Sequence, residues 1–257
     1  MKHSASIQGA ALASPPQIIA PEHRLLTITA SAPPSRPGQF IGIRISSLAD
    51  PLLRRPFSIF DHSGDTLRIV VKIVGRGTAI LAERSPGPLD IIGPLGNGFT
   101  ILRDSRVLLV GGGVGNAPLH YLAGVLSAAK CDVTYIYGAR SADAIFCPES
   151  FEARSNRFIT VTDDGGRGRK GLAADAASDL IQSEPFDMIY ACGPKPMLEA
   201  VADLSRRSGI PAEVSIENYF GCCIGVCSAC TVHTPEGPRR ACAEGPVFDA
   251  ALLIMES

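Results

Sequence analysis

The segment RVLLVGGGVGNAPLHYLAGVLSAAK, residues 106–130, decides the fold of the second half of this chain. It begins with a short apolar run, Arg106–Val110, which predicts a buried strand. A glycine-rich turn follows, and the leucines of Ala117–Lys130 then recur at helical spacing, which predicts a helix with one apolar face. A strand, a glycine turn and a helix in this order form the local context of a dinucleotide-binding site.

Strand and helix signals continue to alternate beyond this segment. The expected strands are Val133–Tyr137, Phe158–Thr162, Met188–Ala191 and Glu213–Ile216, and the expected helices are Gly171–Gln182 and Pro196–Arg207. Such alternation predicts an α/β domain with a parallel sheet and helices on both faces. Ligands of such sheets bind at the carboxyl ends of the strands.

The first hundred residues have a different pattern, in which short apolar or alternating runs are separated by turn-rich stretches. These runs are His23–Ala30, Gln39–Ile45, Pro56–Phe60, Thr66–Val74 and Leu89–Ile92. They predict a small antiparallel β-barrel with one short helix at Thr78–Glu83. The expected fold class is therefore α+β and α/β, with a barrel at 1–103, a parallel-sheet domain at 104–217 and a cysteine-rich lobe at 218–257.

Composition excludes two classes of function. The formal net charge is −1 and the basic residues form no stripe, so we expect no nucleic-acid partner. No window contains about 18 uninterrupted apolar residues, so we expect no membrane span.

Five of the eight cysteines fall within residues 222–242. Cys222, Cys227, Cys230 and Cys242 follow C-x4-C-x2-C spacing plus a later fourth cysteine, as in plant-type [2Fe–2S] ferredoxins, with a shorter last gap. A structural zinc site or a disulfide pair are the alternatives, although zinc sites usually combine two CxxC pairs. Metal binding favours a reducing compartment, hence the cytoplasm. Cys223 is a spare thiol that we expect to point away from the cluster.

Two motifs on the predicted barrel indicate a flavin site. In Arg55-Pro56-Phe57-Ser58, the arginine is placed to pair with a phosphate while the serine hydroxyl reaches a flavin ring; an arginine on a solvated strand edge is the alternative. In the second motif, Gly75, Gly77 and Thr78 stand at a helix start and suit a pyrophosphate. A plain turn with a threonine cap explains the second motif equally well.

The nicotinamide site is expected around Gly112, Gly113 and Gly115. The motif departs from strict GxGxxG because Pro118 replaces the third glycine, and Arg140 rather than an acid ends the second strand, which favours a 2′-phosphate. A tight strand–helix turn is the alternative.

The end of a later strand of the same predicted sheet supplies a second group. Cys192 and Gly193 lie there, where Cys192 either faces a nicotinamide or is a buried small residue. Thr162-Asp163-Asp164-Gly165 ends another strand, and its carboxylates either touch the cofactor or form a plain turn.

Read in order, RPFS, GRGT, GGGVGNAPL and CGPKPM resemble the ferredoxin–NADP reductase superfamily. The C-terminal cysteine motif is similar to that of the iron–sulfur electron-transfer subunits of dihydroorotate dehydrogenase B, and the resemblance covers nearly the whole chain. Where that family usually has glycine after the first ligand, this chain has Cys223, whose side chain would crowd the cluster loop or shift the potential of the cluster.

The resemblance implies bound FAD, NAD and a [2Fe–2S] cluster. It implies residues near FAD, namely Arg55, Pro56, Phe57, Ser58, Gly75, Gly77 and Thr78. It implies residues near NAD, namely Gly112, Gly113, Gly115, Cys192 and Gly193, and it makes Ser58 and Cys192 the catalytic candidates. The implied cluster ligands are Cys222, Cys227, Cys230 and Cys242.

The implied activity is an electron relay in pyrimidine biosynthesis. A nicotinamide moves two electrons as hydride, a [2Fe–2S] cluster takes one, and a flavin converts between them. The implied partner is an FMN-containing catalytic subunit that oxidises dihydroorotate, in a heterotetramer. The apolar residues Val247, Phe248, Leu252, Leu253 and Ile254 either contribute to that interface or pack a small core. Alternatives are a reductase subunit that serves a ferredoxin or a hydrogenase, and a redox-sensing regulator.

Overall fold

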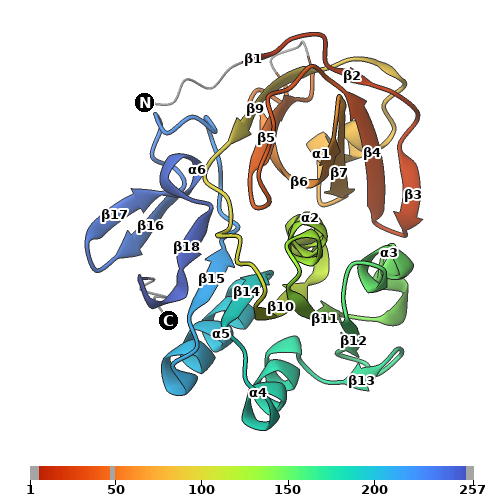
Figure 1. Ribbon diagram of the computed structural model, residues 1–257. Helices are drawn as coiled ribbons and strands as arrows, with labels where there is room; N and C mark the ends of the chain where they lie inside the picture. The colour runs from red at the N-terminus through yellow and green to blue at the C-terminus, as the bar shows by residue number, and fades with distance from the viewer. Residues whose placement is uncertain (1–5, 47–49, 253–257) are drawn as a thin grey trace.

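The computed structural model describes residues 6–46 and 50–252. In this part of the chain, the N-terminal strands form a nine-stranded antiparallel half-barrel in the order β1-β9-β5-β6-β7-β4-β2-β8, with β3 beside β4 (Figure 1). The strands are β1 (Ser6–Ile7), β2 (Ala11–Leu12), β3 (Gln17–Ala20), β4 (His23–Thr29), β5 (Phe40–Arg44), β6 (Arg55–Ser63), β7 (Thr66–Lys72), β8 (Gly87–Pro88) and β9 (Asp90–Leu95). One helix, α1 (Arg76–Ala82), follows β7.

The alternation of buried apolar and exposed polar side chains along the strands explains this barrel. Leu67, Ile69 and Val71 of β7 are 0% exposed, whereas Arg68 between them is exposed. Side chains two residues apart point to the same face of a strand, so the apolar set fills the barrel interior. The predicted antiparallel barrel is thereby confirmed.

The second sheet has seven strands in the described residues, in the order β13-β12-β11-β10-β14-β15-β18. Its strands are β10 (Arg106–Gly112), β11 (Asp132–Ala139), β12 (Arg157–Thr162), β13 (Arg169–Lys170), β14 (Met188–Cys192), β15 (Ala212–Ser215) and β18 (Val247–Asp249). Its helices are α2 (Asn116–Ala128), α3 (Pro148–Glu152), α4 (Ala173–Ser183) and α5 (Lys195–Ser208), with short 3₁₀ turns at Gly113–Gly115 and Ala142–Ala144.

The order of the strands reverses at β10. The chain runs from β10 outward to β11 and β12, then returns to the other side of β10 with β14 and β15. The carboxyl ends of β10 and β14 therefore lie side by side, with Gly111 paired to Cys192. A reversal of this kind leaves a crevice at the carboxyl edge, where such sheets bind ligands.

Alternate residues of β10 pack against opposite helix layers. Val107 and Leu109 belong to the core with α2 and α3, whereas Leu108 and Val110 belong to the core with α4 and α5. Figure 1 shows α2 and α3 on the side of the sheet that faces the barrel, and α4 and α5 on the far side. The predicted parallel sheet with two helix layers is confirmed.

Helix α2 joins the two large sheets. Its His120 is 1% exposed and stacks on Phe60 of β6 with ring centroids 3.9 Å apart. The carbonyl of Phe60 accepts from Nδ1 at 3.1 Å, so Nε2 is the acceptor for the Ser150 hydroxyl at 2.6 Å. Tyr121 adds a hydrogen bond from its hydroxyl to the carbonyl of Ser35 at 3.0 Å.

The cysteine-rich lobe is inserted between two strands of the second sheet. It contains β16 (Thr231–Thr234), β17 (Gly237–Arg240) and α6 (Ala241–Glu244), and β18 then pairs antiparallel with β15 before the 3₁₀ turn Ala250–Leu252. The sequence analysis ended this sheet at Glu213–Ile216, because three residues of β18 are too few to show periodicity. Among the apolar residues considered for an interface, Val247 and Phe248 are buried and Leu252 is 40% exposed, while Leu253 and Ile254 lie outside the described residues.

Candidate functional site

A cavity of about 550 Å³ lies between the barrel and the carboxyl edge of the second sheet. Protein cavities that bind small molecules typically measure about 300–1,000 Å³. Its barrel wall is built by residues of β5, β6 and β7, and its other wall by the turns after β10, β14 and β15. Eight of the residues proposed for the flavin and the nicotinamide therefore line one space, with Ser58 on the barrel wall and Cys192 on the other. They are Pro56, Phe57, Ser58, Thr78, Gly112, Gly113, Gly115 and Cys192.

The RPFS motif lies at the start of β6. Pro56, Phe57 and Ser58 line the cavity, and Arg55 does not. The Arg55 Nη1 donates to the carbonyl of Leu53 at 2.7 Å. A Cβ atom on Gly77 would lie 3.3 Å from Arg55 Nε, so the arginine rests directly on the start of α1. The two barrel motifs, about twenty residues apart in the chain, are thus in contact.

The turn before α1 is closed by a threonine. Thr78 accepts from the backbone N–H groups of Val74 and Gly75 at 2.9 and 3.2 Å, and donates to the carbonyl of Gly75 at 2.9 Å. Thr78 also lines the cavity. The Gly75 N–H already donates to the Thr78 hydroxyl, so it is not free to bind a phosphate. A pyrophosphate at this predicted site would therefore have to be bound by Arg55 and by the other backbone N–H groups at the start of α1.

The glycines after β10 allow two backbone turns to approach each other closely. A Cβ atom on Gly115 would lie 2.4 Å from the Cys192 carbonyl oxygen, and one on Gly193 would lie 3.1 Å from the Gly112 Cα. Gly113 has φ +55°, which is unfavourable for residues with a side chain. The structure thus brings together the five residues predicted for the nicotinamide, namely Gly112, Gly113, Gly115, Cys192 and Gly193.

Asn116, which the sequence analysis did not single out, holds this turn in place. It is fully buried, and its Nδ2 donates to the carbonyls of Gly113 and Gly138 at 2.9 and 3.2 Å. Its Oδ1 accepts from the Tyr135 hydroxyl at 3.1 Å. Pro118 lies in the first turn of α2, where backbone N–H groups have no partner within the helix, so a proline there removes no hydrogen bond.

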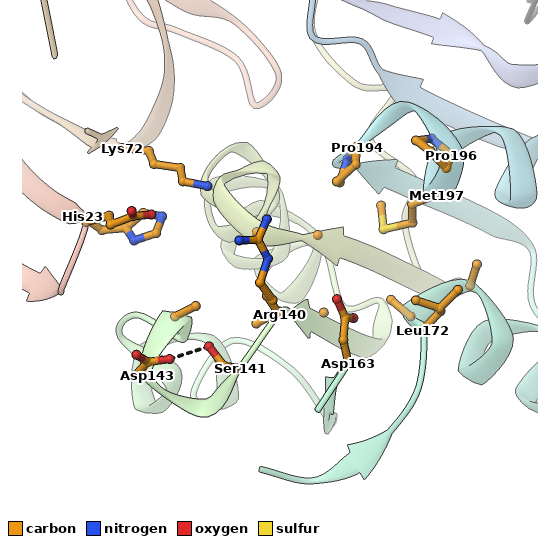
Figure 2. Close-up of a pocket in the computed structure, with 18 of the residues that line it drawn as sticks. His23, Lys72, Arg140, Ser141, Asp143, Asp163, Leu172, Pro194, Pro196 and Met197 are labelled. Carbon is orange, nitrogen blue, oxygen red and sulfur yellow. Dashed lines mark hydrogen bonds between the residues drawn. The ribbon is translucent and has the colours of Figure 1, made fainter. Parts of the chain in front are cut away.

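A second cavity of about 580 Å³ continues from the first along the carboxyl edge. The two cavities share the wall residues Lys72, Gly112, Gly113 and Pro194. Figure 2 shows Lys72 and Arg140 reaching into this space from opposite sides, with His23 beside Lys72.

Acidic groups, Glu22 among them, also line the second cavity. Asp163 lies below Arg140 in Figure 2, and Asp143 accepts a hydrogen bond from Ser141. This arrangement of cations and carboxylates suits a long ligand with phosphate and hydroxyl groups.

Cys192 and Glu217 both line the first cavity. Burial, reinforced by the charge of Glu217, raises the pKa of the Cys192 thiol far above its usual value, so the thiol is protonated. Burial also raises the pKa of Glu217, although Lys72 opposes the shift. The Glu217 side chain is exposed to water, yet it lies in the wall of the cavity, where the surrounding protein atoms still raise the pKa of its carboxyl. Neither Lys72 nor Glu217 belongs to a recognisable motif, so sequence reasoning missed both.

The four predicted cluster ligands lie together in the C-terminal lobe. Cys230 and Cys242 are 1% and 2% exposed, Cys222 is half-buried and Cys227 is exposed. No described group of three or more His, Cys, Asp and Glu side chains is arranged around one metal-ion position. The thiols instead interact as two pairs, Cys222 with Cys227 and Cys230 with Cys242. A two-iron cluster held by four cysteines has two thiolates on each iron, so this set fits it better than a single zinc ion.

Backbone amides already point at these sulfurs. The Gly225 N–H donates to Cys242 Sγ at 3.1 Å, the Val226 N–H to Cys222 Sγ at 3.3 Å and the Cys242 N–H to Cys230 Sγ at 3.4 Å. Burial opposes ionisation of Cys222, but nearby backbone N–H groups outweigh it and lower the pKa of this thiol to about 6. Such donors favour thiolates and tune the potential of a bound cluster.

Cys223 is turned toward the protein core. It is 0% exposed, and a Cβ atom on Gly42 of β5 would lie 3.6 Å from its own Cβ. Burial, with the charge of Cys222, raises its pKa to about 11. The backbone of Cys223 has a left-handed φ of +64°. That Cys223 points away from a bound cluster stays a prediction.

Two family descriptions match the chain. Residues 217–254 match the iron-sulfur cluster binding domain of dihydroorotate dehydrogenase B, and residues 109–203 match the oxidoreductase NAD-binding domain. Among the described residues, no helix is both long and apolar enough to cross a membrane.

The chain is similar to curated proteins along most of its length. It is 41% identical to the electron transfer subunit of dihydroorotate dehydrogenase B (NAD(+)) from Geobacillus kaustophilus over 86% of this chain and 87% of that protein. The corresponding subunit from Bacillus caldolyticus is 40% identical, with 86% and 87% covered.

Solved structures share the fold. A chain of an NADH-dependent reduced ferredoxin-NADP oxidoreductase superposes with a TM-score of 0.85 and 31% identity, covering 99% of this chain and 92% of that one. A ferredoxin NADP+ reductase from Neisseria gonorrhoeae has a TM-score of 0.62 and 16% identity over 74% and 86% of the two chains, and this likeness concerns the fold alone.

Proposed function

This chain belongs to the family of electron transfer subunits of dihydroorotate dehydrogenase B. We propose that it accepts electrons from a partner subunit that oxidises dihydroorotate, and that it passes these electrons to NAD⁺. This reaction belongs to pyrimidine biosynthesis. FAD occupies the cavity beside the barrel, NAD the adjoining cavity, and a [2Fe–2S] cluster the four paired thiols. When bound, these groups supply hydride transfer, conversion between two-electron and one-electron steps, and single-electron transfer.

One observation carries this proposal: the two cavities adjoin, and the wall of the first includes Phe220, which directly precedes the cysteine loop. Lys72, Gly112, Gly113 and Pro194 belong to both cavities. At the other end of the first cavity Phe220 forms part of the wall, and Cys222 is only two residues further along the chain. A ligand in the first cavity would therefore lie beside the second cavity and beside the segment that leads into the thiol-bearing loop.

The protein's own side chains have distinct tasks in the first cavity. Ser58 presents its hydroxyl from the barrel wall, and Cys192 presents a protonated, buried thiol from the opposite wall. A protonated Cys192 excludes water without adding charge where the two cofactors meet. Arg55, on the start of α1 beside Gly77, holds the phosphate end of FAD.

Exposure of the cysteine loop supports docking of the partner at this end. Cys227 is exposed, and its neighbours Ile224 and Val226 are 46% and 76% exposed. We propose that this loop faces the catalytic partner subunit, that the partner carries FMN, and that the assembly is a heterotetramer. All eight cysteines are free in the structure, which suits the reducing cytoplasm as the compartment of the complex.

The test removes two thiols from the loop. We expect Cys227→Ala combined with Cys230→Ala to lose the electron paramagnetic resonance signal of a reduced [2Fe–2S] cluster. NADH should still bleach the flavin at an unchanged rate in stopped flow, because neither residue lines a cavity. Electron transfer from the dihydroorotate-oxidising partner should then stop. Cys147→Ala, which removes a thiol far along the chain from the loop, is the matched control and should keep the signal. A double variant with an intact cluster signal would contradict the ligand assignment.

A second function is favoured by the superposition on the NADH-dependent ferredoxin-NADP oxidoreductase chain. In that case the chain serves a ferredoxin or a hydrogenase instead of dihydroorotate oxidation. Co-purification separates the two: an FMN protein that reduces the chain with dihydroorotate supports the first function. A multi-cluster or nickel protein that does so with its own substrate supports the second.

A further inference from the structure

Arg240 is the last residue of β17, and its side chain reaches the cysteine loop, residues 221–230. Its Nη1 donates to the carbonyl of Gly225 at 2.7 Å. A Cβ atom on Gly225 would lie 3.7 Å from the same nitrogen, so the guanidinium group packs directly on this part of the loop. The contact joins the β16–β17 hairpin to the loop that carries three of the four predicted cluster ligands.

The peptide groups on both sides of Gly225 point at sulfur atoms. The Gly225 N–H donates to Cys242 Sγ at 3.1 Å, and the Val226 N–H donates to Cys222 Sγ at 3.3 Å. The Gly225 carbonyl and the Val226 N–H belong to one planar peptide group, because the peptide bond joins residue 225 to residue 226. The carbonyl that accepts from Arg240 is therefore the opposite end of a group whose N–H donates to a predicted ligand.

A cation at the carbonyl end of a peptide group strengthens the donor at its other end. Consecutive hydrogen bonds polarise one another, and a bond from a charged donor is stronger than one from a neutral donor. Hydrogen bonds to the sulfurs stabilise the more negative, reduced state of an iron–sulfur cluster, so they raise its reduction potential. Loss of the Arg240 contact should therefore lower the potential of a cluster bound here.

Glu244 of α6 acts in the opposite direction. Its Oε2 accepts from Arg240 Nε at 3.1 Å and from the Arg240 backbone N–H at 2.9 Å. The carboxylate thus holds the guanidinium group in place and offsets part of its positive charge. A glutamine at this position would keep an accepting oxygen but lose the negative charge, so the potential should rise.

We propose that Arg240 tunes the potential of the [2Fe–2S] cluster through the peptide group between Gly225 and Val226, with Glu244 as its counter-charge. Arg240 is a positioning residue, since it acts on the sulfurs through the backbone of the loop. The inference rests on the proposed function, because it takes a [2Fe–2S] cluster as the ligand of the four thiols.

Arg239 provides a matched control. Its side chain is 42% exposed and that of Arg240 is 44% exposed, so solvent screens the two charges similarly. Arg239 pairs with Glu236 at 2.7 Å and with Glu244 at 3.6 Å. Within the described part of the chain, no hydrogen bond joins the Arg239 side chain to the cysteine loop. Removing its charge therefore leaves the peptide group unaltered.

The experiment is a redox titration of the cluster in the cofactor-loaded chain, followed by electron paramagnetic resonance. We expect Arg240→Gln, with a shorter and uncharged side chain, to lower the equilibrium constant for cluster reduction about tenfold, which is about 59 mV for a one-electron couple. Arg239→Gln should change this constant by less than about threefold. Glu244→Gln should raise it, whereas Glu236→Gln should leave it within about threefold. Glu244→Gln keeps the Arg240 contact, so it tests the inference even where Arg240→Gln assembles no cluster.

Three outcomes overturn the inference. An unchanged potential in Arg240→Gln would show that the contact with Gly225 has no influence on the cluster, and a potential that does not rise in Glu244→Gln would remove the counter-charge. Equal shifts in Arg240→Gln and Arg239→Gln would attribute the effect to surface charge instead of the peptide group. Failure of the proposed function looks different: the unaltered chain would then show no cluster signal after reduction.

Discussion

At the scale of single residues, His120 makes stability depend on pH. Burial, reinforced by the charge of Arg154, lowers the pKa of His120 to about 4 from 6.5. The unfolded chain therefore takes up this proton before the folded chain does, as the pH falls. The stabilisation is complete above about pH 6.5 and declines toward pH 4, by up to about 3 kcal/mol. Protonation would also turn Nε2 into a donor, so the Ser150 hydroxyl would have to accept this hydrogen bond instead of donating it.

Urea unfolding at pH 7.5, 6 and 5 tests this expectation. His120→Gln should be less stable at pH 7.5 but should lose less stability between pH 7.5 and 5 than the unaltered chain. His233→Gln, on the exposed face of β16, should follow the unaltered chain at every pH. An identical pH profile for His120→Gln would show that another group governs acid sensitivity.

Sequence patterns locate a site better than they assign roles to isolated polar residues. Gly112, Gly113 and Cys192 follow predicted strands, and because strand ends share one edge of a sheet, their convergence was predictable. Lys72 and Glu217 stand singly within ordinary sequence. Their place on the cavity wall arises from neighbours distant in the chain, which no local pattern encodes.

At the scale of elements, the cysteine loop depends on a glycine. Gly225 has φ +79°, and a Cβ atom there would lie 2.9 Å from the Cβ of Ala243 in α6. Its N–H also donates to Cys242 Sγ. We expect Gly225→Ala to displace this amide and to reduce iron and labile sulfide per chain to about half or less, at a cost of about 1–2 kcal/mol from backbone strain plus the close contact.

Gly237→Ala is the matched control for this loop. Gly237 lies in the β16–β17 hairpin with φ +109°, and a Cβ atom there would meet no atom within 4 Å. It shares the unfavourable backbone conformation without the contact to α6. Iron content should therefore stay close to normal, and equal loss in both variants would attribute the effect to strain alone.

Length decides which elements can be read from sequence. Helix α2 and strands β4, β7 and β10 have seven or more residues each, and their apolar periodicity is visible. Strands β1, β2, β8 and β13 have two residues each, too few for any period. Strands β1, β2 and β13 pair with the longer strands β9, β4 and β12, whereas β8 pairs with β2. Such short strands form where a neighbouring strand offers unpaired backbone groups.

At the scale of the whole molecule, Asn97 links the segment between β9 and β10, which leads from the barrel to the second sheet, to the end of the cysteine lobe. Its Nδ2 donates to the carbonyls of Glu244 and Val247 at 3.2 and 2.8 Å, and its Oδ1 accepts from the Val247 N–H at 3.0 Å. Val247 is buried, so Asn97→Ala leaves its backbone groups without partners. We expect a loss of about 1–3 kcal/mol in the free energy of unfolding.

Chemical denaturation followed by both flavin and cluster absorbance measures this loss. Asn97→Asp keeps the acceptor for Val247 but sets a carboxylate oxygen against the two carbonyls that the amide nitrogen served, so it should be at least as destabilising as Asn97→Ala. A stability of Asn97→Ala equal to that of the unaltered chain would mean that water replaces all three bonds.

Strand β18 returns the chain to the sheet after the cysteine lobe and pairs with β15, the strand that the lobe follows. The cysteine lobe is therefore attached, where the chain enters it and where the chain leaves it, to two adjacent hydrogen-bonded strands of one sheet. Electron tunnelling slows steeply as donor and acceptor separate. A lobe held at both ends would keep the donor–acceptor distance constant during thermal motion. A lobe attached at one end only would let that distance, and with it the rate of electron transfer, fluctuate.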